Sequence, residues 1–219
     1  MLTKIKLIDL HSHTFMSDGV ATPIELIRYA QKGGYFAFGI TDHVDLSNYK
    51  EVIEKTLKLK EASYGDLIFI PGIEITHVAP KNISKIVNYA RDNGINWVGV
   101  HGETPVEPVM KGTNLAAIEA RVNFLAHPGF INEDTIKLAV KNDVWLELTK
   151  RGGHNMTNGY IFKKAYPLGA KFIINSDAHK TSELYKKELY INVALGTGMS
   201  KEIFLENNQK LYNWIIKNR

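Results

Sequence analysis

Short apolar runs alternate with longer amphipathic segments along the chain, and this alternation constrains the fold more than any other feature. Seven runs have the length and the β-branched or aromatic content of β-strands. They cover residues 5–10, 36–40, 67–71, 97–100, 122–126, 144–148 and 172–175. Repeated βα units with short links favour a parallel sheet with right-handed crossovers. Because seven units are one short of the usual eight, we predict an α/β fold, a distorted TIM-like (β/α)7 barrel.

The segments between the runs carry helix signals. Thr22 precedes Pro23 and an early acid, which is typical of a helix start, and that helix should end near Gly33. Further helices are predicted over residues 49–62, 83–92, 114–120, 133–141, from after 154 to about 169, and 200–217. Since no linker, repeat or low-complexity segment interrupts the pattern, we predict one domain over residues 1–219, with the last helix packed against it.

The composition excludes several classes of protein. With 219 residues, 44% hydrophobic, the chain is long enough for one domain with a sizeable core. The absence of cysteine excludes disulfides, iron–sulfur clusters and thiolate zinc sites. A net charge of +4 without a long basic block suits a small anionic substrate as well as nucleic acid. No apolar run approaches the ~20 residues of a membrane span, and residues 1–4 lead into the first run without a signal-peptide pattern. We therefore expect a cytoplasmic protein that does not engage a membrane.

Six of the seven runs end in histidine or an acid, and those endings could form one cluster. The residues concerned are Asp9, His11, His13, Asp42, His43, Glu74, His101, His127, Asp177 and His179. Side chains that follow parallel strands converge at the carboxyl end of a barrel, where α/β enzymes place their sites. Imidazole and carboxylate ligands without sulfur suit Zn²⁺, Mn²⁺ or Fe. The pattern therefore indicates a metalloenzyme.

These endings, with Asp18, resemble the ordered motif series of the PHP (polymerase and histidinol phosphatase) superfamily. The motifs are Asp9-x-His11-x-His13, Ser17-Asp18-Gly19, Thr41-Asp42-His43, Gly72-Ile73-Glu74, His101, His127-Pro128-Gly129 and Ser176-Asp177-Ala178-His179. The resemblance covers positions 9 to 179 in the family's order. It implies a distorted seven-fold β/α barrel, in agreement with the strand count, and a phosphoesterase with three divalent metal ions at the barrel mouth.

Carried over residue by residue, the resemblance implies three ligand sets. They are His11, His13, Glu74 and Asp177 for one metal, Glu74, His101 and His127 for a second, and Asp18, His43 and His179 for a third. Glu74 would bridge two metals, and Glu74, Asp177 and His179 would carry the catalysis. Some family members have His in place of Asp18. Three divalent ions carry more charge than three carboxylates neutralise, so the site would attract a phosphate. A hydroxide activated by two metals would attack phosphorus.

Asp9 and Asp42 precede metal ligands, so we expect them to accept hydrogen bonds from imidazole N–H groups. The alternative is that they are capping acids at strand ends. Arg151 and His154 lie in a Gly-rich loop after the sixth run, which should hang over the site. There the guanidinium and the imidazole could bind substrate phosphate, unless the loop is a solvated surface segment.

Three other residues have weaker functional signals. His77 follows Glu74 by three positions and should line the same mouth to contact substrate, or else is an ordinary polar loop residue. Glu103 follows His101 and is a candidate for substrate binding or for holding a ligand. Glu147, near the end of the sixth run, faces either the barrel interior or a helix, and its periodicity does not decide between them.

The leading functional prediction is hydrolysis of a small phosphomonoester or phosphodiester, such as histidinol phosphate or a nucleotide. One alternative is a 3′–5′ exonuclease, although the chain lacks the extended basic and aromatic stripe of a dedicated nucleic-acid binder. Another is a non-catalytic, RNA-associated subunit, because an archaeal and eukaryotic ribonuclease P protein shares this barrel without its ligands. The presence of all the expected ligands argues against that alternative. The substrate, the metal identity and the oligomeric state stay open.

Overall fold

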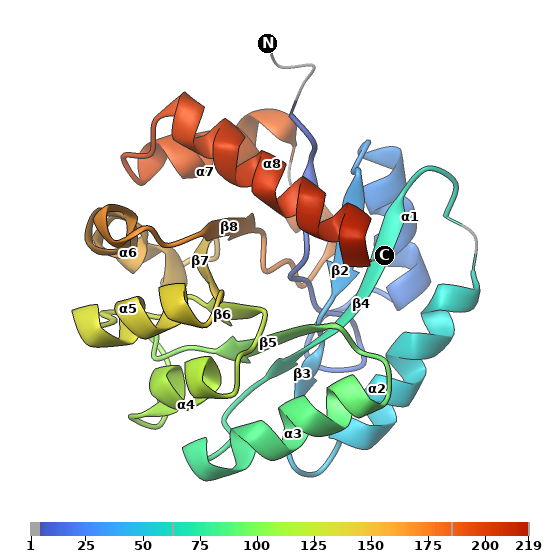
Figure 1. Ribbon diagram of the computed structural model, residues 1–219. Helices are drawn as coiled ribbons and strands as arrows, with labels where there is room; N and C mark the ends of the chain where they lie inside the picture. The colour runs from blue at the N-terminus through green and yellow to red at the C-terminus, as the bar shows by residue number, and fades with distance from the viewer. Residues whose placement is uncertain (1–4, 63, 185, 219) are drawn as a thin grey trace.

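Eight parallel strands form a nearly closed barrel in the computed structural model, which describes residues 5–62, 64–184 and 186–218 (Figure 1). Residues 1–4, 63, 185 and 219 of the expected domain, with the N-terminal lead into the first strand, lie outside the described residues. The strands are β1 (Ile8–Asp9), β2 (Ala37–Ile40), β3 (His43–Val44), β4 (Ile68–Ile75), β5 (Trp97–His101), β6 (Phe124–Ala126), β7 (Trp145–Thr149) and β8 (Phe172–Asn175). The order β1-β2-β4-β5-β6-β7-β8 confirms the expected seven-unit barrel.

The eighth strand, β3, arises because the line of β2 is interrupted after Ile40 and resumes at His43. β2 pairs with β4 as far as Pro71, and β3 pairs with the remainder of β4 at Glu74 and Ile75. We expected this run to end at Pro71, but β4 continues to Ile75. Pro71 lies at the point where β4 passes from one partner to the next. Glu74 is therefore a strand residue and not a turn acid.

The seam between β1 and β8 closes the barrel through the segments that follow these strands. Ser12 and Ala178 form a parallel bridge, and the backbone N–H of His13 donates to the carbonyl of Ala178 at 2.8 Å. The N–H of Asp177 donates to the carbonyl of His11 at 3.1 Å. Residues from the two ends of the motif series therefore lie side by side.

Helices surround the barrel (Figure 1) and largely match the expected boundaries. They are α1 (Pro23–Lys32), α2 (Tyr49–Lys58), α3 (Pro80–Asp92), α4 (Thr113–Glu119), α5 (Glu133–Lys141), α6 (Asn158–Ala165), α7 (Lys187–Gly196) and α8 (Lys201–Asn218), with short 3₁₀ turns η2 (Leu59–Glu61), η3 (His154–Thr157), η4 (Tyr166–Leu168) and η5 (Thr181–Glu183). α7 was not anticipated from the sequence. At α1, Thr22 and Glu25 form a reciprocal capping box, as the start signal indicated.

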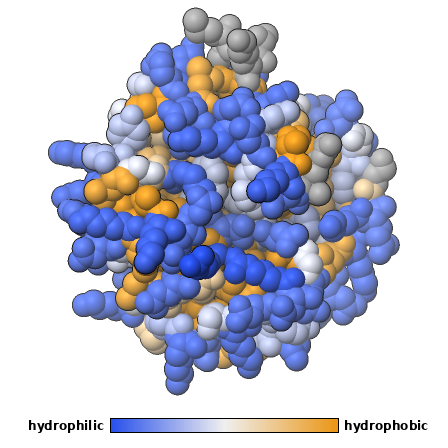
Figure 2. All heavy atoms as spheres, in the orientation of Figure 1, coloured by the Kyte–Doolittle hydropathy of each residue, from blue (hydrophilic) through white to orange (hydrophobic). Residues whose placement is uncertain are grey.

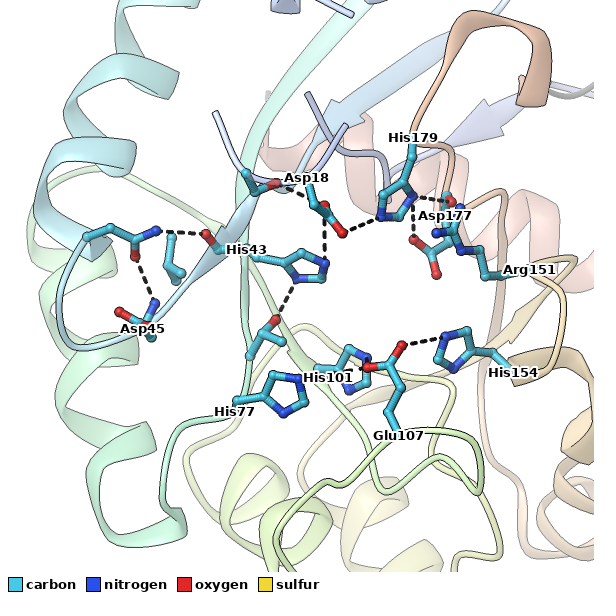
Figure 3. A pocket seen from close by; sticks show the side chains of 14 residues that line it. Asp18, His43, Asp45, His77, His101, Glu107, Arg151, His154, Asp177 and His179 are labelled. Carbon is cyan, nitrogen blue, oxygen red and sulfur yellow. Dashed lines mark hydrogen bonds and ion pairs between the residues drawn. The ribbon is translucent and has the colours of Figure 1, made fainter. Parts of the chain in front are cut away.

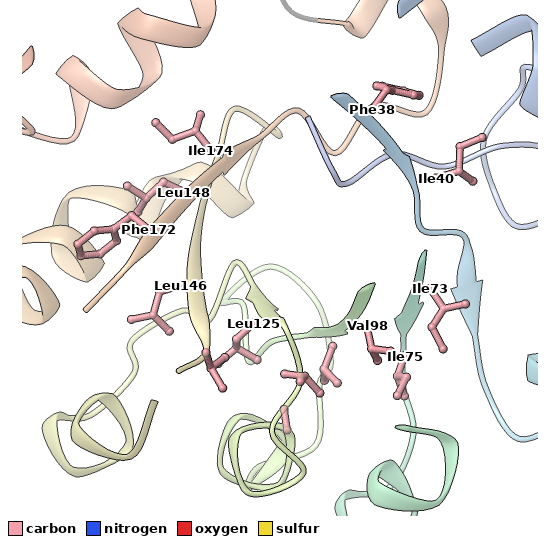
Figure 4. Close-up of a cluster of buried hydrophobic side chains, with 14 of the residues drawn as sticks. Phe38, Ile40, Ile73, Ile75, Val98, Leu125, Leu146, Leu148, Phe172 and Ile174 are labelled. Atoms are coloured by element: carbon pink, nitrogen blue, oxygen red, sulfur yellow. The ribbon is translucent and has the colours of Figure 1, made fainter. Parts of the chain in front are cut away.

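The two faces of each strand carry different side chains, because successive residues point to opposite sides of a strand. Aliphatic residues such as Ile73, Val98 and Leu146 point outward and pack beneath the helices (Figure 4). Large aromatic residues, among them Trp97 and Phe124, fill the interior. α8 joins this interior cluster. One end of the barrel interior is thus an apolar core, and the polar residues at the carboxyl ends of the strands lie at the opposite end of the barrel.

On the face shown in Figure 2, hydrophilic side chains cover most of the molecule and apolar residues are scattered among them. Among the described helices, none is both long enough and apolar enough to cross a bilayer.

Gly99 tests how tightly the interior is packed. A Cβ at this position would lie 2.2 Å from the ring of Phe124, which is fully buried and stacks on Trp97 at 5.2 Å between ring centroids. We expect Gly99→Ala to lower the free energy of unfolding by about 1–3 kcal/mol, since overpacking forces side chains off their preferred positions. Urea denaturation measures the change. Gly196→Ala, where nothing lies within 4 Å of the added Cβ, is the control and should leave stability close to wild type.

Candidate metal centre

A cavity of about 350 Å³ opens at the carboxyl ends of the strands (Figure 3). Its lining includes eight of the residues singled out from the sequence, namely Asp18, His43, His77, His101, Arg151, His154, Asp177 and His179. His11, His13, Glu74 and His127 lie beneath them and are buried. The folded barrel therefore brings together residues that are up to 168 positions apart, from His11 to His179.

Glu74 is at the centre of this group. Its Oε2 lies 3.1 Å from His11 Nε2, 3.5 Å from His13 Nε2 and 3.0 Å from His43 Nδ1. Its Oε1 lies 3.8 Å from His127 Nε2. Contact with histidines from three expected ligand sets is the arrangement that a bridging carboxylate requires.

The first expected set comes together completely. Asp177 Oδ1 lies 3.1 Å from His13 Nε2 and 3.8 Å from His11 Nε2, the same two nitrogens that Glu74 approaches. His11, His13 and Asp177 can offer ligand atoms that all lie within 4.8 Å of one another. Two of the expected ligands have a positive φ, 53° for Asp177 and 27° for His127. Such conformations are costly for residues with a Cβ and are concentrated at functional sites.

The third expected set also comes together, with His13 beside it. Asp18 lies between two imidazoles (Figure 3), with Oδ1 3.5 Å from His43 Nε2 and Oδ2 3.1 Å from His179 Nε2. The loop that carries Asp18 passes very close to the backbone of His13. A Cβ on Gly19 would lie 2.3 Å from the carbonyl oxygen of His13.

The second expected set is extended by another residue. The rings of His101 and His127 are 4.3 Å apart, and His154 stacks on His127 at 4.2 Å. These three histidines can offer ligand atoms within 4.8 Å of one another. Glu74 reaches this group through His127.

The donor atoms fit divalent metal ions. Seven buried atoms of the cluster make no hydrogen bond within the described structure: His11 Nε2, His13 Nδ1 and Nε2, Glu74 Oε1 and Oε2, His101 Nδ1 and His127 Nδ1. Leaving a buried polar atom unsatisfied costs about 1–3 kcal/mol. Their concentration in one place, with only nitrogen and oxygen donors, is what a site for Zn²⁺, Mn²⁺ or Fe provides.

The electrostatics favour the ligand forms of Glu74, His13 and His127, but not of every residue in the cluster. Burial opposes protonation of His11 and His43, yet the carboxylates of Glu147 and Glu74 outweigh it, so that the pKa of His11 lies well above its usual range and the pKa of His43 is raised to about 10. Burial opposes ionisation of Glu74, but His11 and His43 outweigh it and hold the pKa of Glu74 well below its usual range. Burial holds the pKa of His13 and of His127 well below the usual range, so both rings stay neutral, the form that binds metals. Burial raises the pKa of Asp177 to about 7. A bound cation would favour its ionised form.

We expected Asp9 and Asp42 to accept hydrogen bonds from imidazole N–H groups, but both accept them from backbone or hydroxyl groups. Asp9 accepts hydrogen bonds from the backbone N–H groups of Ser176 at 3.0 Å and His11 at 3.4 Å, and burial raises its pKa to about 6. Asp42 accepts from the backbone and hydroxyl of Thr14, each at 2.7 Å, and from the hydroxyl of Ser17. Both carboxylates therefore fasten the backbone around the cluster, because they lie beside N–H groups of neighbouring segments.

Glu147 takes the role that we expected of Asp9 and Asp42. It faces the barrel interior, and its Oε1 lies 2.6 Å from His11 Nδ1 and accepts from the side-chain amide of Asn175 at 2.8 Å. Its Oε2 accepts from the backbone N–H of His127 at 3.2 Å. A carboxylate on the second ring nitrogen fixes the tautomer and the orientation of a ligating histidine.

Of the residues expected to bind substrate, Arg151 and His77 line the cavity and Glu103 does not. Arg151 lies at the rim, with Nη1 3.4 Å from Glu183 Oε2, and His77 lines the same mouth and is half exposed. Glu103 does not line this cavity: its carboxylate accepts from the backbone N–H groups of Gly112 at 3.0 Å and Asn114 at 2.9 Å, at the start of α4. The carboxylate of Glu103 therefore stabilises the start of α4.

Glu107 lines the cavity and was not anticipated. It lies between His101 and His154 (Figure 3), and its hydrogen bond with His101 lowers the pKa of Glu107 to about 2. It belongs to the loop between β5 and α4, where no strand or helix period indicates direction. Its spacing of six residues from His101 was the only available signal.

The role of Glu147 can be tested with Glu147→Gln. We expect the affinity for Zn²⁺ or Mn²⁺ to fall by about 10- to 100-fold, the usual effect of removing a partner of a ligating histidine, because His11 loses its charged acceptor. Calorimetric titration of the metal-free protein measures the affinity. Glu51→Gln, the same change at an exposed position of α2, is the control. Unchanged metal binding in Glu147→Gln would show that His11 needs no orientation by this carboxylate.

Two proteins of known sequence place this chain among its relatives. An uncharacterized protein of Methanocaldococcus jannaschii, MJ1295, is 46% identical over 198 residues, covering 89% of this chain and 91% of that protein. The DNA polymerase/3′-5′ exonuclease PolX of Bacillus subtilis is 26% identical over 200 residues, covering 80% of this chain but only 35% of PolX.

Solved structures share the fold at low sequence identity. The histidinol phosphate phosphatase of Lactococcus lactis, in complex with zinc, L-histidinol and phosphate, has a TM-score of 0.63 at 15% identity and covers 89% of this chain and 95% of its own. A chain of archaeal ribonuclease P with mature tRNA has a TM-score of 0.64 at 15% identity, with 95% and 89% covered. A profile of the PHP domain matches residues 9–216. With its ordered motifs gathered at the mouth of a seven-unit barrel, the chain belongs to the PHP domain family.

Proposed function

We propose that this protein is a metal-dependent phosphoesterase that hydrolyses a small phosphomonoester or phosphodiester. The observation that carries the proposal is the set of buried imidazole and carboxylate atoms around Glu74 that make no hydrogen bond and lie under an open cavity. A histidinol phosphate phosphatase of the same fold binds zinc, L-histidinol and phosphate in its solved structure, which supports this class of reaction. We propose three divalent ions as cofactors, with Zn²⁺, Mn²⁺ and Fe as candidates.

The residues of the chain would divide the work. Divalent ions, when bound, polarise phosphoryl oxygens and lower the pKa of a coordinated water. The three proposed catalytic residues are Glu74, Asp177 and His179. Asp177 and His179 line the cavity where the phosphoryl group would bind, and Glu74 is buried beside them. Arg151 lies at the rim, where its guanidinium can donate two parallel hydrogen bonds to a phosphate. His77 lies at the half-exposed edge of the same mouth and is placed to meet the remainder of the substrate.

The size of the cavity favours a small substrate. Its volume of about 350 Å³ is at the lower end of the range for small-molecule sites. The exonuclease alternative has support from the likeness to PolX, but the chain spans only 35% of that protein. The RNA-associated alternative has only the fold in its favour, and it leaves the buried ligand set without a purpose. The expected cytoplasmic location stays a prediction.

A hydrolysis screen tests the proposal. The purified protein, reconstituted with Zn²⁺, Mn²⁺ or Fe²⁺ and with its metal content measured, is assayed against phosphomonoesters, cyclic nucleotides and single-stranded DNA. We expect chelator-sensitive hydrolysis, fastest on small phosphomonoesters or cyclic phosphates. Glu74→Gln should reduce the rate more than Asp18→Asn, because buried Glu74 contacts histidines of all three ligand sets, whereas half-exposed Asp18 makes its two shortest histidine contacts within the third set. A fully metallated protein without hydrolytic activity would contradict the proposal, and equal losses in the two variants would contradict the bridging role of Glu74.

The rim residue Arg151 offers a narrower test. We expect Arg151→Ala to retain metal content and folding but to reduce kcat/KM by about 10- to 100-fold, as loss of a charge-assisted hydrogen bond of roughly 1.5–3 kcal/mol implies. Steady-state kinetics on the best substrate measure the change. Arg28→Ala, which removes a guanidinium from exposed α1, is the control. Unchanged kinetics in Arg151→Ala would make Arg151 an ordinary rim cation.

A further inference from the structure

Two residues outside the family's ligand pattern lie against the second metal position. Glu107 Oε2 lies 3.0 Å from His101 Nε2, and Glu107 Oε1 lies 3.2 Å from His154 Nε2. His154 in turn stacks on His127. The four side chains come from two strand ends and two loops. Figure 3 shows three of them, His101, Glu107 and His154, at one side of the cavity, and His127 is buried beside them.

We propose that His101, His127, His154 and Glu107 together form a four-ligand shell for the second metal ion. In this assignment His154 and Glu107 bind the metal and not the substrate. The inference rests on the metal centre that the proposed function requires, and it adds two ligands that the motif series does not contain. Glu74, whose Oε1 lies 3.8 Å from His127 Nε2, would then border this shell without being one of its four ligands.

The distances are those of a coordination shell. With bonds of about 2.0–2.2 Å to nitrogen and oxygen, neighbouring donors around one ion are roughly 3–3.5 Å apart. Both contacts of the Glu107 carboxylate lie in this range. The three histidines can offer their donors within 4.8 Å of one another, so a single ion can reach all of them with small adjustments.

The orientation of the rings points to a ligand in the same place. His154 Nδ1 lies 2.9 Å from the hydroxyl of Thr104, which turns Nε2 toward Glu107. A partner on one ring nitrogen is what fixes a ligating histidine. His101 and His127 are 3% and 1% exposed, and each has a buried Nδ1 that makes no hydrogen bond. Two adjacent imidazoles thus keep an unsatisfied nitrogen beside His154, and a cation explains them where packing does not.

The two loops are held together by close packing. A Cβ on Gly153, which has a φ of +85°, would lie 3.2 Å from the side chain of Val106. This contact sets the residue before His154 directly against the residue before Glu107. Glu103 fixes the other part of the loop at the start of α4. The position of Glu107 is therefore built into the fold, although it follows from no motif.

The proposal changes the chemistry of the centre in two ways. Four protein ligands close a coordination sphere, as in structural metal sites, whereas catalytic sites keep a position open. The second ion should therefore be held more tightly than the others, and substrate should approach the first and third. Glu107 also adds one negative charge to those of Asp18, Glu74 and Asp177, so three divalent ions would retain a smaller positive excess.

Metal titration of the intact protein tests the shell. Metal-free wild type, Glu107→Gln and His154→Gln are titrated with Co²⁺, whose visible spectrum distinguishes four-coordinate from six-coordinate sites, and their zinc content is measured after reconstitution. We expect each variant to lose one ion, or to bind it more than about 100-fold more weakly, beyond the usual effect of an outer partner. The four-coordinate Co²⁺ bands should disappear with it. His77→Gln is the matched control, because His77 also approaches Glu107, at 3.8 Å, but is half exposed.

The outcomes separate this shell from the proposed reaction. Wild-type stoichiometry and affinity in both variants would overturn the assignment, and a raised KM with unchanged metal content would return the two residues to substrate binding. A protein without phosphoesterase activity whose variants still lose one ion would retain the shell and lose the proposed function. Since Glu107 and His154 lie in different loops, misfolding of one variant, seen as altered thermal unfolding without metal, leaves the test to the other.

Discussion

The burial of Glu74 among histidines is the interaction on which the rest of the site depends. An ionised carboxylate removed from water is strongly unfavourable unless it is paired. Here β4 holds Glu74 with no exposed surface, and His11, His13 and His43 surround its Oε2. Such an arrangement requires β3 to lie beside the second half of β4 and the β1–β8 seam to close opposite it. Barrel closure and the assembly of the cluster are therefore the same event.

The alternation of side chains along each strand divides the barrel between stability and chemistry. Outward-facing aliphatic residues pack beneath the helices, while inward-facing residues are apolar at one end of the barrel and polar at the other. The ring of Phe124 lies 5.2 Å from that of His11, so the cluster of histidines and carboxylates lies directly on the apolar interior. Exclusion of water from below strengthens every charge interaction in the cluster. The same interior makes unsatisfied polar atoms costly there, which a bound cation relieves.

Three of the cavity-lining side chains come from loops and not from the strand ends. Arg151, His154 and Glu107 all belong to segments outside the strand ends, and each reaches the cavity through contacts peculiar to these loops. Loops tolerate variation while a rigid scaffold holds the shared ligands. Differences in substrate and in metal retention between PHP proteins are therefore expected to arise here, and the low identity to solved structures of the same fold is consistent with this division.

The sequence by itself determined the parallel seven-unit barrel and the gathering of histidines and acids at its mouth, because strand period and strand order require the endings to converge on one edge. Only the tertiary structure decided the partners. Glu147 lies in a strand buried on both faces, where hydrophobic pattern cannot tell the inside from the outside. Asp9 and Asp42 accept hydrogen bonds from backbone N–H groups of neighbouring segments, and no local sequence pattern reveals these contacts. Glu107 reaches the cavity through packing between two loops, and such contacts exist only once the chain has folded.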